Sequence, residues 1–181
     1  MTEAMTATHA PSAYGVLTEP TTLKLQRLLP GPIERVWAYL TDGELRRQWL
    51  AAGTMELKAD APFEFVWRND ELTDPPGQRP EGFAAENRMQ CRIVDVQPPH
   101  KLVFTWGANA EVTFELDPRD DGVLLSLTHR RVTERGVLLN VSAGWHSHLD
   151  VLTARLSGTT PLPHWDNWSS LRKDYEQRLP A

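Results

Sequence analysis

Apolar and polar residues alternate along much of the chain between residues 21 and 130, with the period of two that is typical of half-buried β-strands. The first such run occupies residues 21–29 and stops at a Pro-Gly pair. The alternation predicts six further strands, at residues 53–57, 63–67, 85–97, 101–106, 112–116 and 123–129. Because most of the connections are short, we expect an antiparallel sheet with one apolar face.

Helical spacing of apolar residues occurs after the first strand and again near the end of the chain. Residues 32–40 predict a short amphipathic helix, and a Thr-Asp pair can cap a second one at residues 43–50. A long helix is predicted at residues 138–156, and Gly158 is placed to end it. The pattern over residues 166–179 favours a final short helix.

The chain has the length of one domain with tails. Residues 1–20 mix Ala, Thr, Ser and Pro without a period, which predicts a disordered tail. Residues 21–158 form the expected domain, and residues 159–181 form a C-terminal extension. The Pro-rich stretch at residues 69–82 is longer than a usual connection, so it is either disordered or a functional lid.

The order of these elements predicts an α+β fold with a cavity. A sheet that is apolar on one face must bury that face, and the long C-terminal helix is the element available to cover it. A strongly twisted sheet that curls round one helix does not close evenly along its length. We therefore expect a helix-grip domain, a curved seven-stranded sheet wrapped round a helix, with a pocket at one mouth.

Composition narrows the classes of partner. The 181 residues are 40% hydrophobic and 24% charged, with a net charge of −5, and no apolar run is long enough to cross a bilayer. A chain without clustered Lys and Arg is not expected to bind nucleic acid. The first residues lack a basic stretch followed by an apolar core, so we expect a cytoplasmic protein without a membrane partner. Oligomeric state is left open.

Several segments resemble the activator-of-heat-shock-ATPase homologue branch of the START/Bet v superfamily, also called SRPBCC. The likeness spans nearly all of residues 21–156. It is carried by PIERVW at residues 32–37, LTD at 40–42, Trp49, DVQPPHKLVFTW at 95–106, VTFELDP at 112–118, LSLTH at 125–129, and Gly144 with Trp145. The resemblance implies the START/Bet v helix-grip fold and a small hydrophobic ligand. The loop at residues 69–82 and the Trp-rich tail depart from the branch, and both could shape ligand choice.

Aromatic residues on the predicted inner faces are the first candidates for ligand contact. Seven tryptophans are a high count for 181 residues, and large aromatic surfaces can stack on a flat polycyclic molecule. Each could instead fill the core. The candidate ligand-binding residues are Trp37, Phe65, Trp67, Met89, Phe104, Trp106, Phe114, His129, Trp145 and His148.

The sequence gives little reason to expect a metal, a cofactor or conventional catalysis. His129 and His148 could each offer a hydrogen bond to a buried ligand, although a core histidine with internal partners is more common. His146 and His148 are two apart on a helix and point to different sides, so they do not form a helical metal pair. We find no nucleophile elbow, phosphate loop or dinucleotide motif. No cofactor and no metal are expected.

A closer resemblance, in size and makeup, is to the enediyne self-sacrifice resistance proteins of the calicheamicin type. It implies antibiotic self-resistance, in which a bound diradical takes a hydrogen atom from a backbone glycine. Gly107, directly after Trp106 at a strand end, is the candidate donor. The alternative is a purely structural role, in which Gly107 only allows the backbone to turn into the next strand.

Three functions remain open at this stage. The first is a stoichiometric binder of an apolar, polycyclic small molecule, with enediyne resistance as its specific form. The second is a chaperone-interacting module, which needs an exposed surface and not a cavity. The third is a cyclase or hydrolase acting on an apolar metabolite, because fold alone does not decide function.

Overall fold

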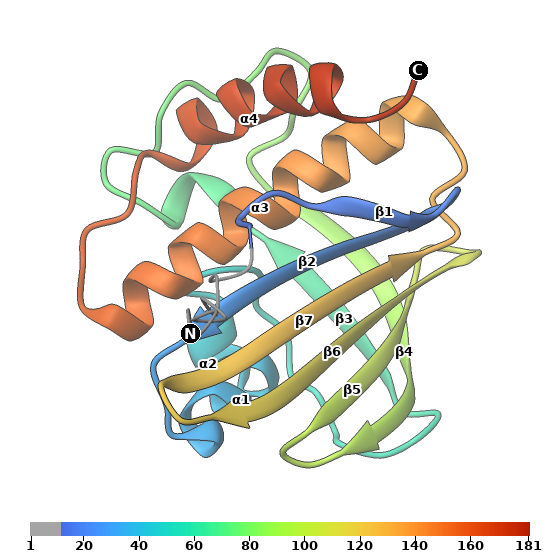
Figure 1. The fold of residues 1–181 in the computed structure, drawn as a ribbon, viewed down its shortest axis with the longest axis vertical. Coiled ribbons are helices and arrows are strands. Elements are labelled where there is room, and N and C mark those ends of the chain that lie inside the picture. Colours follow the sequence, from blue (N-terminus) through green and yellow to red (C-terminus); the bar gives the residue numbers. More distant parts are fainter. Residues whose placement is uncertain (1–11) are drawn as a thin grey trace, which may run out of the picture.

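The computed structural model describes residues 12–181, which form a curved antiparallel sheet covered by two helices (Figure 1). The strand order is β1-β2-β7-β6-β5-β4-β3, and each neighbouring pair is antiparallel. The strands are β1 (Val16–Glu19), β2 (Thr22–Leu29), β3 (Pro62–Trp67), β4 (Asn87–Gln97), β5 (Lys101–Trp106), β6 (Ala110–Arg119) and β7 (Gly122–Arg130).

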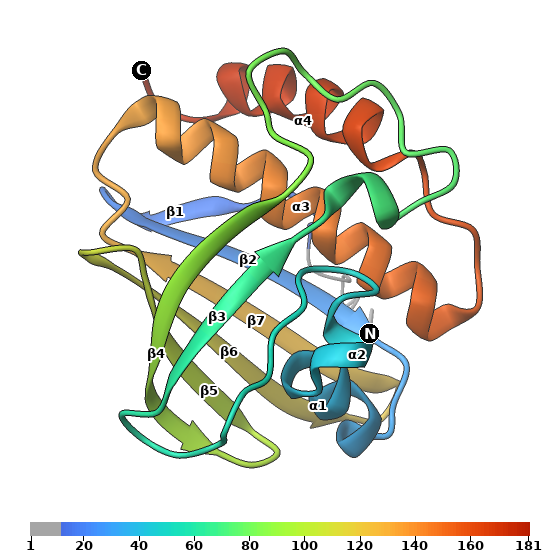
Figure 2. The same ribbon diagram turned by 180° about the vertical axis from the view of Figure 1, so that it is seen from behind.

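The helices occupy two places around this sheet. Helices α1 (Ile33–Thr41) and α2 (Gly43–Arg46) lie together at one end. Helix α3 (Arg135–Ser157) runs across the open side of the sheet, and α4 (His164–Arg178) packs on α3 (Figure 2). A single 3-10 turn, η1 (Asn69–Glu71), follows β3. Within residues 12–181, no helix combines the length and apolarity needed to cross a bilayer.

The predicted helix-grip fold is confirmed, and two local signals explain its helix ends. Asp42 accepts hydrogen bonds at Oδ1 from the backbone N–H groups of Glu44 (2.9 Å) and Leu45 (3.2 Å), so it caps α2 as expected. Gly158 ends α3 with a φ of +69°, a left-handed conformation that glycine adopts without steric cost.

Two strand assignments from the sequence were wrong, although the total of seven is right. Residues 53–57 contain no strand, because Gly53 has a φ of +129° and its carbonyl accepts from the Arg46 guanidinium, which turns the backbone away from the sheet. Only Ala52 bridges to Val66. The seventh strand is β1, in the segment where we expected a disordered tail. The rest of that segment, residues 1–11, lies outside the described residues.

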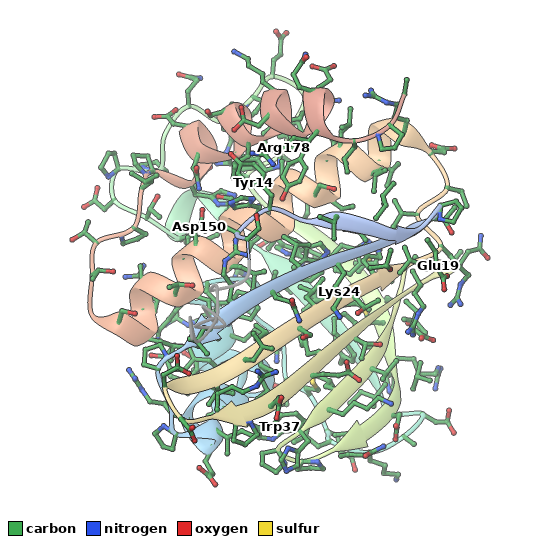
Figure 3. All side chains as sticks on the ribbon, viewed as in Figure 1. Tyr14, Glu19, Lys24, Trp37, Asp150 and Arg178 are labelled. Carbon is green, nitrogen blue, oxygen red and sulfur yellow. The ribbon has the colours of Figure 1, made fainter. Side chains whose placement is uncertain are left out.

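Strand β1 and the segment before it are ordered by contacts that composition does not reveal. Tyr14 donates from its phenol to Asp174 Oδ2 (2.8 Å), and the Arg178 guanidinium lies 3.5 Å from the centre of the Tyr14 ring. The Gly15 N–H donates to the Tyr175 phenol (2.7 Å). Figure 3 shows Tyr14 and Arg178 together beside α4. These contacts offset the entropy of ordering a short polar segment.

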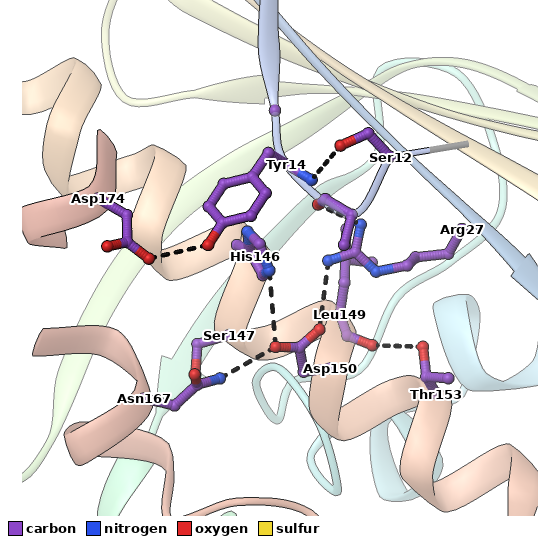
Figure 4. A network of polar contacts seen from close by, with 12 residues as sticks. Ser12, Tyr14, Arg27, His146, Ser147, Leu149, Asp150, Thr153, Asn167 and Asp174 are labelled. Atoms are coloured by element: carbon purple, nitrogen blue, oxygen red, sulfur yellow. Dashed lines mark hydrogen bonds and ion pairs between the residues drawn. The ribbon is translucent and has the colours of Figure 1, made fainter. Parts of the chain in front are cut away.

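A partly buried polar network fixes α4 against α3 (Figure 4). Asp150 on α3 accepts from Arg27 Nη2 on β2 (3.3 Å) and from Asn167 Nδ2 on α4 (3.0 Å). His146 Nδ1 lies 2.8 Å from the Tyr175 phenol. The C-terminal extension predicted as a possible short helix is therefore a longer helix, joined to the domain by both polar and apolar contacts.

Candidate functional site

A cavity of about 380 Å³ lies between α3, α4 and the β3–β4 edge of the sheet. Five of the seven tryptophans of the chain line it, which is why we call it the tryptophan pocket. Its wall consists of Leu50, Trp67, Asn69, Phe83, Asn87, Arg88, Met89, Trp106, Asn140, Val141, Gly144, Trp145, His148, His164, Trp165 and Trp168. This volume is within the range of small-molecule binding sites.

The aromatic wall has two parts. On the sheet side, the Trp106 ring centre lies 5.6 Å from that of Trp67 and 5.2 Å from that of Trp145. On the α4 side, Phe83 lies 5.1 Å from Trp168 and 5.7 Å from Trp165. Tilted and edge-on contacts of this kind are the arrangements that aromatic pairs prefer.

The loop at residues 69–83 and the start of α4 form one continuous side of the pocket. The first N–H groups of a helix have no acceptors within the helix, and here the loop provides the acceptors. The backbone N–H of His164 donates to Thr73 Oγ1 (3.0 Å), and the backbone N–H of Trp165 donates to the Pro76 carbonyl (2.9 Å). Asp166 Oδ1 accepts from Gln78 N (2.9 Å) in return. The loop is therefore an ordered part of the wall.

Two buried histidines form the polar end of the pocket. The rings of His148 and His164 are 4.8 Å apart, and only 6% and 1% of these residues are exposed. His148 Nδ1 lies 2.8 Å from the Trp49 carbonyl, and His164 Nδ1 lies 2.9 Å from Ser147 Oγ. Burial lowers the pKa of His148 to about 4 and that of His164 to about 2, so both are neutral at neutral pH.

The structure places the sequence-predicted residues in two groups. Trp67, Met89, Trp106, Trp145 and His148 lie on the pocket wall. The other ligand-contact candidates do not: three phenylalanines and His129 lie in the core behind the wall, and Trp37 lies on α1. The three phenylalanines are Phe65, Phe104 and Phe114.

The residues behind the wall support it. His129 Nδ1 accepts the indole N–H of Trp145 (3.0 Å), which fixes the orientation of that ring. Burial lowers the pKa of His129 to about 4, so it stays neutral and can accept this hydrogen bond. Gly107, the candidate hydrogen donor, is exposed in the turn between β5 and β6 with a φ of +60°, and it is not on the wall.

The sequence analysis did not name several wall residues as ligand contacts, including Asn69, Gly144, His164, Trp165 and Trp168. The Trp-rich composition after Gly158 was the available signal, but nothing local shows that this segment folds back over α3. Within residues 12–181, no three His, Cys, Asp or Glu side chains gather in a way that could hold a metal ion.

A curved antiparallel sheet closed by a long C-terminal helix, with an apolar cavity between them, defines a helix-grip protein of the START/Bet v (SRPBCC) superfamily, a fold typical of proteins that bind small hydrophobic ligands. The family model described as "Activator of Hsp90 ATPase homolog 1-like protein" matches residues 30–157, and the chain belongs to this family, AHSA1. No curated protein sequence matches the chain.

Solved structures of related proteins agree with this assignment. The protein encoded by gene BPP1335 from Bordetella parapertussis is 36% identical, with a TM-score of 0.79 over 96% of this chain and 94% of its own. CalU16 from Micromonospora echinospora is 20% identical, with a TM-score of 0.64 over 86% of each chain. DynU16, from the dynemicin biosynthetic locus, is 16% identical, with a TM-score of 0.63 over 79% of this chain and 49% of its own. The last two likenesses concern the fold.

Proposed function

We propose that this protein binds a flat, polycyclic, apolar small molecule in the tryptophan pocket. The observation that carries the proposal is the wall itself, where five indole rings and Phe83 surround a cavity of about 380 Å³. Large aromatic side chains usually fill interior space, and protein interiors are close-packed. A cavity lined by so many rings is therefore suited to an aromatic guest that completes the packing.

Fluorescence titration with pyrene tests this proposal. Tryptophan emission overlaps pyrene absorption, so bound pyrene should quench the protein and saturate at one equivalent. Trp168→Ala, which removes one ring of the wall, should weaken binding about tenfold, since an aromatic contact contributes roughly 1 kcal/mol beyond its buried area. Trp37→Phe is the matched control, because Trp37 lies on α1 away from the pocket. Absence of saturable binding contradicts the proposal, and turnover of a guest favours an enzyme instead.

The specific form of the proposal is self-resistance to an enediyne antibiotic. The description of DynU16 places one protein of this fold in the dynemicin biosynthetic locus, and the pocket suits a bulky apolar guest. A guest diradical would take a hydrogen atom from a glycine Cα, forming a C–H bond and leaving a Cα radical. Dioxygen from solution would then add to that radical, and the chain would break. The wall glycine is Gly144, so we propose Gly144 as the donor in place of Gly107.

Incubation with thiol-activated calicheamicin and DNA, followed by mass spectrometry of the protein, tests this form. We expect one protein chain cut for each equivalent of drug, with fragment ends at Gly144. Gly144→Ala should abolish that cut, whereas Gly136→Ala on the same helix should not change it. A cut at Gly107 would instead support Gly107 as the hydrogen donor, as the sequence analysis expected. Intact protein with cleaved DNA would exclude self-resistance and leave ligand binding unaffected.

A further inference from the structure

The hydrogen-bond partner of His148 fixes which of its ring nitrogens carries the proton. Its Nδ1 lies 2.8 Å from the Trp49 carbonyl oxygen, and a carbonyl can only accept, so Nδ1 carries the hydrogen. In the neutral ring, Nε2 is then a bare acceptor. No partner for Nε2 is found among residues 12–181, and His148 lines the tryptophan pocket while being only 6% exposed.

His164 has the same arrangement one helix away. Ser147 Oγ lies 3.3 Å from the His164 carbonyl oxygen, to which it donates, and 2.9 Å from His164 Nδ1. Because the hydroxyl has one hydrogen, both contacts are satisfied when Nδ1 donates to the hydroxyl oxygen. This leaves His164 Nε2 as a second bare acceptor. His164 also lines the pocket and is 1% exposed.

Asn69, in the η1 turn that packs on the start of α4, supplies a third acceptor on the pocket wall. Its Oδ1 is buried and, within the part of the chain that the structure describes, has no hydrogen-bond partner. The η1 turn that carries Asn69 packs on the start of α4, where Asp70 Oδ1 accepts from the Trp165 indole N–H (2.8 Å). A buried polar atom without a partner is costly, unless a ligand or water supplies the missing donor.

We infer that the ligand of the tryptophan pocket is an aromatic compound with hydroxyl or other hydrogen-bond donor groups at one end, directed at His148, His164 and Asn69. This inference rests on the proposed function, because it names the class of molecule that the same pocket accepts. The aromatic body would contact the indole wall, and its hydroxyl groups would donate to the bare acceptors. A guest with only ether or carbonyl oxygens at that end would leave them without donors.

Three probes with the same ring system are pyrene, 1-methoxypyrene and 1-hydroxypyrene. Together they distinguish the proposed binding of an aromatic guest from the inferred preference for a hydrogen-bond donor. The wild-type protein should bind 1-hydroxypyrene about tenfold more tightly than 1-methoxypyrene, which corresponds to one hydrogen bond in a buried site. Equal affinities for the three probes would overturn the inference and leave the proposed function intact. Failure of all three to bind would overturn both.

Substitutions at the polar end identify the acceptors. Asn69→Ala should remove much of the preference for 1-hydroxypyrene, and it breaks no side-chain hydrogen bond within residues 12–181. His148→Phe keeps a flat ring without the acceptor and should reduce the preference similarly, with circular dichroism checking the fold. The control is Asn109→Ala, which lies in the exposed turn between β5 and β6, outside the pocket, and should keep the full preference. Unchanged preference in both pocket variants would contradict the assignment of these acceptors.

Discussion

Acidification from pH 7 to about pH 4.5 is expected to destabilise the folded protein by roughly 7 kcal/mol, the largest stability effect that we predict. Four histidines are buried with a lowered pKa: about 4 for His129, His146 and His148, and about 2 for His164. Burial is the main cause in each. For His146, the nearby Asp150 opposes the effect of burial, so we expect a smaller contribution from it.

Stability falls with decreasing pH because the histidines bind protons more tightly in the unfolded chain than in the folded protein. Unfolded histidine has a pKa near 6.5. Above that pH neither state binds a proton at these sites and the stability is complete. As the pH falls toward the folded pKa values, only the unfolded chain takes up protons, and each histidine costs up to about 1.4 kcal/mol per pH unit. The loss should therefore begin near pH 6.5 and level off near pH 4 for three of the histidines, while that of His164 continues toward pH 2.

Urea unfolding at a series of pH values measures this loss. His164→Gln should flatten the pH dependence, since it removes one buried titrating group. The control is Asn109→Gln, at an exposed and uncharged position in the turn between β5 and β6, which should leave the pH dependence of the wild-type protein unchanged. A free energy of unfolding that stays constant from pH 7 to pH 5 would show that the histidines are not protected as the structure implies.

The sheet was predictable because each of its longer strands repeats one physical rule several times. Val112, Phe114 and Leu116 on β6 alternate along the strand and are all buried, whereas Glu115 between the last two is exposed. The predicted strand at residues 53–57 had only two apolar positions, and one glycine with positive φ overrode them. The segment before β1 depends on partners more than 150 residues away, such as Asp174 for Tyr14, which no local pattern encodes.

The candidate site was only partly predictable, because periodicity gives the face of a strand but not the position of the cavity along it. On β3, Phe65 and Trp67 share one face, yet Phe65 is in the core and Trp67 lines the pocket. Phe104 and Trp106 on β5 show the same division. In both strands the wall residue is the last one.

The packing of the protein does not explain why residue 144 is a glycine. Gly144 lies inside α3, where glycine is less favourable than alanine by roughly 1 kcal/mol. A Cβ at this position would meet only Trp168 Nε1, at 3.9 Å, an ordinary contact distance. The pocket, which Gly144 lines, gives a reason for the missing side chain: a bound molecule can approach the helix backbone there.

Gly144→Phe is therefore expected to weaken pyrene binding by at least about 100-fold, because the new ring would occupy the cavity that the guest needs. The fold should survive, since the cavity of about 380 Å³ can take the side chain, and a thermal melt checks this. Gly136→Phe is the matched control: the same change on the same helix, at an exposed position with no atoms within 4 Å of a new Cβ, should leave affinity unchanged. A folded Gly144→Phe protein that binds pyrene normally would place the guest elsewhere, and the proposed pocket would then be wrong.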